Sequence, residues 1–372
     1  MNWLIAPNAF KGTLEADHAA AIIAEVIGSF RRDDRIDSCP IADGGDGTCF
    51  LLSQQLGLEK VEAWVCGPLG RPKRGFFGYE PATRSAFLDV STVSGIKGLT
   101  DYERDPWTSS TYGTGELIRL ALAEGAAHLV LGLGGSATID MGTGILQALG
   151  LQFLDKNGRE LIPFAPGFLA KIAHIQLPVR LPSLRITCLC DVGNTFFGPE
   201  GAVPVFGPQK GLTEPKQGPF LEAAGKLFAL MQKKSKWALE DQACFGAAGG
   251  IALGLRAFFP VDLKQGARYF FEKTGMEERI RQADLVLTGE GRFDSQSAHG
   301  KGSYELLQLA KKHGKKCWLI TSGEEGKDAG FDEVLRLPDL NFSSPRLALE
   351  AESNLRAALL QRLNGSLDGY PV

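Results

Sequence analysis

The sequence predicts an α/β protein in which segments from both ends of the chain form one parallel sheet. Near the N-terminus, the apolar run 3–6 is followed by helical periodicity over 19–27 and by a second expected strand at 36–41. Such a strand–helix–strand unit is typical of a parallel sheet. The C-terminal third repeats this pattern, with strands expected at 284–288, 317–320 and 333–337 and helices at 303–313 and 344–363.

The first helix is predicted by an apolar stripe. Apolar residues within 19–27 recur at the i, i+3, i+4, i+7, i+8 spacing of a helix with one buried face. Thr13 is the expected N-cap, because its hydroxyl can accept a hydrogen bond from the first turn. Glu15 and Asp17 would then lie where the helix dipole favours acidic side chains.

The middle of the chain has a different pattern, which indicates a second α/β domain. Short strands are expected at close spacing, a helix follows the glycine- and hydroxyl-rich stretch 109–115, and two more strands come later. The expected strands are 61–67, 74–80, 85–90, 129–131 and 186–190. We therefore predict an inserted domain over 61–264, and a first domain that combines 1–60 with 265–372.

Composition excludes several classes of protein. The 40 Lys and Arg residues against 43 Asp and Glu give a net charge of -3, which argues against a nucleic-acid partner. No apolar run reaches 18 residues, and the N-terminus lacks the basic start of a signal peptide, so we expect a cytoplasmic protein without membrane contact. The seven cysteines lack CxxC pairs, which favours core thiols over disulfides or a zinc site.

Glycine is the unusual residue of this chain. The 46 glycines are about 12% of the sequence, against a usual ~7%. Twenty of them fall in five segments, most of which follow expected strands: 42–48, 132–144, 191–211, 246–250 and 289–302. A tight turn explains any single glycine loop. Their recurrence at strand ends, where α/β sheets bind ligands, indicates phosphate binding instead.

The same segments carry the ionisable residues that phosphoryl transfer requires. The carboxylates are Asp43, Asp46, Asp140, Asp191, Glu290 and Asp294, and the lysines are Lys11, Lys210 and Lys301. Carboxylates can hold Mg²⁺ or accept a proton, and lysines can neutralise phosphate charge. Each of these residues could instead be a turn, cap or surface residue. A Walker A loop is absent, and 132–137 fits the dinucleotide-binding pattern only loosely.

Ordered motifs along almost the whole chain resemble those of the bacterial type I glycerate kinase family. They are 6–14 (APNAFKGTL), 41–48 (IADGGDGT), 111–118 (TYGTGELI), 134–138 (GGSAT), 205–211, 246–250 and 287–292. The resemblance implies transfer of the ATP γ-phosphoryl group to a hydroxyl of glycerate with Mg²⁺. It also implies a flavodoxin-like domain, split by the inserted domain, with the active site in the cleft between them.

The resemblance implies roles for particular residues. Asp191 and Asp294 are the expected catalytic base and Mg²⁺ ligands, and Lys11 and Lys210 are expected to clamp carboxylate or phosphate. The expected substrate- and nucleotide-binding residues are Asn8, Asp43, Gly44, Gly45, Gly47, Thr48, Gly134, Gly135, Ser136, Thr138, Lys210, Glu290 and Lys301. The chain departs from the family at Ile139 and Met141, where Asn and Gly are usual.

The most favoured activity is phosphorylation of the 2-hydroxyl of D-glycerate, because family members that resemble this chain mostly make 2-phosphoglycerate. The spacing of the motifs does not distinguish the 2-hydroxyl from the 3-hydroxyl, so 3-phosphoglycerate is the alternative product. An NAD-dependent hydroxy-acid dehydrogenase using 132–137, or a non-catalytic two-domain binder, are the alternatives. We expect a small-molecule substrate and a monomer or homodimer.

Overall fold

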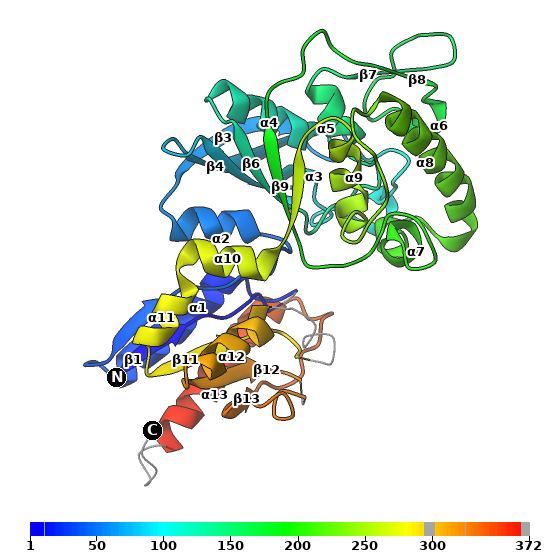
Figure 1. Cartoon of the computed structure of the whole chain (residues 1–372). Helices are drawn as coiled ribbons and strands as arrows, with labels where there is room; N and C mark the ends of the chain where they lie inside the picture. The colour runs from blue at the N-terminus through cyan, green and yellow to red at the C-terminus, as the bar shows by residue number, and fades with distance from the viewer. Residues whose placement is uncertain (11, 294–301, 324, 366–372) are drawn as a thin grey trace. The chain divides into compact units, whose positions relative to one another are not determined.

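The structure, a computed structural model, describes residues 1–10, 12–293, 302–323 and 325–365 (Figure 1). Contacts divide the chain into two units. Unit 1 combines Met1–Asp43 with Ala267–Val372, and unit 2 is Gly44–Gly266. The boundaries predicted from the sequence are 60/61 and 264/265, so the two divisions differ mainly over the helix α2 (Thr48–Gln55).

Unit 1 contains a sheet of strands from both ends of the chain. Its order is β13-β12-β11-β1-β2, and every pair is parallel. The strands are β1 (Asn2–Ile5), β2 (Arg35–Ser38), β11 (Leu285–Gly289), β12 (Lys316–Thr321) and β13 (Glu333–Arg336). Numbered within unit 1 alone, they follow the order 2-1-3-4-5 of flavodoxin-like sheets. The predicted α/β class and parallel sheet are confirmed.

Helices cover both faces of this sheet. On one face, α1 (Ala16–Phe30) packs against α13 (Leu347–Gly365) over alternate strand residues such as Trp3, Ile5 and Leu287. On the other face, α11 (Met276–Gln282) contacts β1, and α12 (Gly302–Lys312) contacts β11 and β12. The helix α10 (Gly266–Thr274) precedes α11. Helices thus bury both faces of the sheet, which is why its central strands are nearly continuous apolar runs.

The start of α1 differs from the prediction. The N-cap position is Glu15, whose side chain makes no capping hydrogen bond, so the assignment of Thr13 was wrong. Phe10 and Leu14 form a tight backbone bridge, in which the Phe10 N–H donates to the Leu14 carbonyl at 2.8 Å. The Thr13 hydroxyl donates to the Phe10 carbonyl within this turn and is therefore turned away from the helix.

Unit 2 contains a mixed sheet in the order β10-β9-β6-β5-β4-β3. Its strands are β3 (Glu59–Cys66), β4 (Pro72–Glu80), β5 (Ser85–Asp89), β6 (His128–Gly132), β9 (Arg185–Cys190) and β10 (Val261–Gln265). The first three strands form the predicted antiparallel meander, and β5, β6, β9 and β10 are parallel. Strand β10 and the short antiparallel pair β7 (Gln152–Leu154) and β8 (His174–Gln176) were not predicted.

The helices of unit 2 enclose its own large hydrophobic core. They are α2, α3 (Ser91–Ser94), α4 (Tyr112–Ala123), α5 (Thr143–Ala148), α6 (Phe168–Lys171), α7 (Ala202–Phe206), α8 (Glu214–Lys234) and α9 (Ile251–Arg256). Helix α2 belongs to this unit because it packs against β4, β5 and β6.

The cysteines are thiols, and most of them lie in the core. All seven cysteines are free thiols, five of them buried, and burial raises the pKa of Cys188 to about 12. The prediction of core thiols is confirmed. In the described part of the chain, no helix is both long enough and apolar enough to cross a membrane.

Candidate functional site

Three of the predicted glycine segments meet at the carboxyl ends of β6 and β9 in unit 2. A Cβ atom at position 134 would lie 2.1 Å from the carbonyl carbon of Gly45, so these two loops are in backbone contact. Gly44, with φ +101°, approaches the carbonyl group of Cys190 so closely that a Cβ there would lie 2.8 Å from its carbon. Glycine is required at both positions because backbone occupies the space of a side chain.

The loop before α2 is closed by Thr48. The hydroxyl of Thr48 accepts the N–H of Gly44 at 3.1 Å and donates to the carbonyl of Gly45 at 3.0 Å. Gly47 is the N-cap of α2 and has φ +82°. Asp46 forms an ion pair with Lys97 at 2.8 Å. The hydroxyl that we expected to contact a ligand therefore already shapes the loop.

A residue that the sequence analysis missed, Asp89, holds the first turn of α2. It ends β5, is 3% exposed, and accepts the backbone N–H groups of Cys49 at 3.0 Å and Phe50 at 2.9 Å. A carboxylate at a helix N-terminus is stabilised by the helix dipole. Burial nevertheless raises the pKa of Asp89 to about 7. The only sequence signal was an acid at the end of an otherwise apolar strand.

Lys210 is buried beneath the second glycine loop. It is 4% exposed, and its ammonium group donates to Ser136 Oγ at 2.8 Å and to the Thr138 carbonyl at 2.9 Å. Burial lowers the pKa of Lys210 to about 7, although the nearby Asp140 carboxylate favours the charged form. The described residues offer no hydrogen-bond partner to the buried Thr138 Oγ1. Lys210 thus fastens the loop 134–138 from within.

Asp140 and the two residues beside it are also interior. Asp140 accepts the N–H and the hydroxyl of Thr111 at 2.9 and 2.8 Å, and the N–H of Gly142 at 3.0 Å. Burial raises its pKa, and these hydrogen bonds oppose that shift. Ile139 and Met141 are fully buried, and Met141 has φ 49°. The two departures from the family pattern therefore contribute apolar core rather than exposed site groups.

The geometry of 132–137 does not suit a dinucleotide. The N–H groups of Leu133 and Ala137 donate to the carbonyls of Leu189 and Ser94, and α5 begins only at Thr143. The dinucleotide-binding pattern requires a helix that opens directly on the glycine turn, with N–H groups available to the pyrophosphate. The dehydrogenase alternative therefore loses its structural basis.

A pocket of about 780 Å³ lies within unit 1, at the carboxyl ends of its strands. Asn8 and Asp43, which follow β1 and β2, line it together with Glu290, which follows β11. The Asn8 side-chain amide donates to Asp43 Oδ2 at 3.0 Å, and its oxygen accepts the N–H of Ala9 at 2.8 Å. Strand β1 lies between β2 and β11, where the strand order reverses, and ligands bind at this point in open α/β sheets.

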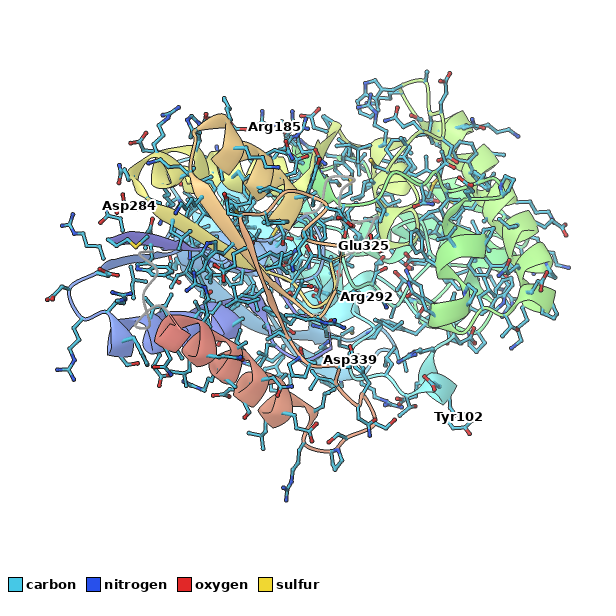
Figure 2. The ribbon with its side chains drawn as sticks, turned by 90° about the horizontal axis from the view of Figure 1, so that it is seen from below. Tyr102, Arg185, Asp284, Arg292, Glu325 and Asp339 are labelled. Carbon is cyan, nitrogen blue, oxygen red and sulfur yellow. The ribbon has the colours of Figure 1, made fainter. Side chains whose placement is uncertain are left out.

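Residues far apart in the sequence complete the pocket. In Figure 2, Arg292 and Asp284 lie at opposite ends of β11, and Arg292, Glu325 and Asp339 lie in the part of unit 1 that the pocket occupies. Other residues that line the pocket are Phe10, Leu14, Ser322, Arg336, Leu340, Phe342, Ala351 and Asn354. No local sequence signal singles out Arg336 or Phe342.

The other predicted site residues either lie in unit 2 or fall outside the described residues. Asp191 directly follows β9 in unit 2 and is exposed, and Gly135 has φ +66° beside Asp46. Lys11, Asp294 and Lys301 lie outside the described residues. Among the described residues, no group of three or more His, Cys, Asp and Glu side chains is placed to hold a metal ion.

Comparison with known proteins gives a consistent result for both units. A model of the glycerate kinase family matches residues 3–363. The glycerate kinase of Bacillus subtilis (strain 168) is 38% identical over 316 residues, which cover 84% of this chain and 82% of that protein. The glycerate 2-kinase of Escherichia coli (strain K12) is 37% identical over 319 residues, covering 85% and 83%. A solved structure described as "putative glycerate kinase 2", from Salmonella typhimurium LT2, is 34% identical, with a TM-score of 0.82 and 99% of each chain covered.

Proposed function

We propose that this chain, which belongs to the glycerate kinase family, uses ATP to phosphorylate the 2-hydroxyl group of D-glycerate and releases ADP and 2-phosphoglycerate. The observation that carries the proposal is the family match over residues 3–363, which spans both units and every glycine loop described above. The name of the E. coli relative, a glycerate 2-kinase, supports the 2-hydroxyl as acceptor.

The reaction requires a base for the acceptor hydroxyl and compensation for phosphate charge. The hydroxyl oxygen attacks the γ-phosphorus, the bond from that phosphorus to the bridging oxygen breaks, and the hydroxyl proton passes to a carboxylate. We assign the base to Asp191 or Asp294. Asp191 supports this assignment because it is exposed at the carboxyl end of β9, beside the Gly44 loop. Lys11 and Lys210 are the proposed charge clamps, and Lys301 is a proposed nucleotide-binding residue. In the structure, Lys210 donates to Ser136 Oγ and to the Thr138 carbonyl.

The oxygen donors in unit 1 fit a magnesium ion. Mg²⁺ is usually bound by one or two carboxylates, while water and substrate phosphates complete its coordination. Asp43 and Glu290 line one pocket and provide such a pair, so they would hold the ion within unit 1. Asp191 and Asp294 are also proposed as magnesium ligands on the strength of the family resemblance. When bound, Mg²⁺ neutralises charge on the transferred phosphate. We also propose a cytoplasmic location and a monomeric or homodimeric state.

A coupled assay tests the activity directly. ADP release should depend on ATP, Mg²⁺ and D-glycerate together, and a rate equal to that without glycerate would refute the proposal. NMR of the product then identifies the acceptor. Coupling of phosphorus to the single proton on C2 supports 2-phosphoglycerate, whereas coupling to the C3 protons would establish 3-phosphoglycerate instead.

A further inference from the structure

The pocket of unit 1 differs from what glycerate alone requires. We propose that this pocket binds the adenine nucleotide, with its polar wall facing the phosphates and its apolar wall facing the base. The inference rests on the proposed ATP-dependent function and goes beyond it, because it assigns the nucleotide to a defined set of residues in one unit. Those residues include Arg292, Arg336 and Phe342, which the sequence analysis did not select.

The size of the pocket is the first argument. Its volume of about 780 Å³ lies within the range of ~300–1,000 Å³ that is usual for small-molecule and cofactor pockets. Its lining follows the strand ends in sheet order, from Asn8 after β1, past Glu290 and Ser322, to Arg336 at the end of β13. Three strand spacings separate β1 from β13, about 14 Å in all. Glycerate, a three-carbon acid, would occupy only a small part of this length.

The pocket has a polar wall and an apolar wall, which come from different parts of unit 1. Polar groups come from the strand ends: Asn8, Asp43, Glu290, Arg292, Ser322 and Arg336. Apolar groups come from the turn before α1, the segment after β13 and helix α13: Phe10, Leu14, Leu340, Phe342 and Ala351. Glycerate has no apolar surface to bury against the second set. A nucleotide has an aromatic base at one end and phosphates at the other, which matches both.

Phe342 is the residue that points most directly to a base. Its side chain is 68% exposed at the edge of the pocket, and its ring packs close to Gly12, where a Cβ would lie 3.3 Å from Phe342 Cε1. An exposed aromatic ring beside a pocket offers a flat surface on which a nucleobase can stack. Stacking is tolerant of base identity, so this contact would provide affinity rather than selection among bases.

The charges of the pocket suit a nucleotide that carries Mg²⁺. Arg292 and Arg336 are exposed cations that can contact phosphate oxygens. Asp43 and Glu290 would repel a bare triphosphate, but they are the oxygen donors that a bound Mg²⁺ uses. The pocket should therefore bind ATP with Mg²⁺ more tightly than ATP alone.

Calorimetric titration of the full chain with ATP and with adenosine, both in the presence of Mg²⁺, tests the assignment. Phe342→Ala should raise the Kd for both ligands about ten-fold, because both stack a base. Arg292→Ala should raise the Kd for ATP about ten-fold and leave that for adenosine unchanged, because only ATP carries phosphate. Leu349→Ala and Arg346→Ala, which change exposed residues that do not line the pocket, are the matched controls.

The outcomes separate this inference from the proposed function. A wild-type protein that phosphorylates glycerate, with variants that bind ATP and adenosine as it does, would overturn the inference and leave the function intact. Absence of both phosphorylation and nucleotide binding in the wild-type protein would overturn both. Photocrosslinking of 8-azido-ATP to the wild-type chain needs no variant: labelling within 337–342 supports the pocket, and labelling confined to unit 2 refutes it.

Discussion

The carboxylate of Asp89 lies 3.0 Å from the backbone nitrogen of Cys49, so the end of β5 holds the first turn of α2. This contact explains why α2 belongs to unit 2, although it follows the second strand of unit 1 in the chain. The same carboxylate fills the space beside Gly132, where a Cβ would lie 2.2 Å from Asp89 Oδ1. Asp89 therefore links the loop 44–47 to the end of β6.

The first prediction concerns the pH dependence of stability at Asp89. Because its pKa is raised from 3.8 to about 7 in the folded state, the folded protein binds more protons than the unfolded chain between these values. Protonation of Asp89 therefore stabilises the folded protein. This stabilisation is complete below about pH 4 and is lost as the pH rises to about 7. Asparagine does not titrate, so the Asp89→Asn variant lacks this pH-dependent stabilisation. The difference in melting temperature, wild type minus variant, should therefore be smaller at pH 8 than at pH 5. An equal difference at both values would contradict the assigned pKa.

The second prediction tests whether Lys210 positions the loop 134–138. Lys210→Met keeps the length of the side chain but removes the hydrogen bonds to Ser136 and Thr138. A small displacement of positioned groups can cost about 10²-fold in rate, and we expect kcat to fall by that order. Lys226→Met, which removes an exposed lysine paired only with Glu222 among the described contacts, is the control. Wild-type kcat in Lys210→Met would rule out the positioning role.

The third prediction concerns the contact between the two glycine loops. Gly134→Ala would place a Cβ 2.1 Å from the carbonyl carbon of Gly45, and the strain should lower the free energy of unfolding by about 1–3 kcal/mol. Gly225→Ala, on helix α8 with no atom near the new methyl group, should instead raise it by up to about 1 kcal/mol. Calorimetric melting measures both. Equal stability of the two variants would mean that the loops separate at no cost.

The fourth prediction concerns the proposed catalytic carboxylates. Asp191→Asn and Asp294→Asn should each lower kcat by about 10²–10⁴-fold, the range for loss of a general base. Asp191→Asn is a nearly isosteric change of an exposed side chain, so the circular dichroism spectrum should stay that of the folded wild-type protein. Asp262→Asn, an exposed change on β10, serves as the control. Full activity in both site variants would remove these residues from the mechanism.

Local patterns were sufficient to predict most strands and the parallel sheet of unit 1. Short, nearly continuous apolar runs at 3–6, 285–288 and 317–320 indicated strands, because helices cover both faces of a parallel sheet. The glycine excess marked five segments, three of which come together in unit 2. It did not indicate that Gly44 and Gly134 serve backbone packing, since a glycine in a loop looks the same in sequence whether it approaches a phosphate or another backbone.

The sequence by itself determined the α/β class, the family and the segments that carry polar and glycine residues. Only the tertiary structure decided that Lys210 is buried, that Asp89 holds α2, and that Phe342 and Arg336 share a pocket with Asn8. The physical reason is that secondary structure depends on neighbours within a few residues. Burial and the lining of a pocket depend instead on strand order, which brings residues more than three hundred positions apart to the same edge of one sheet.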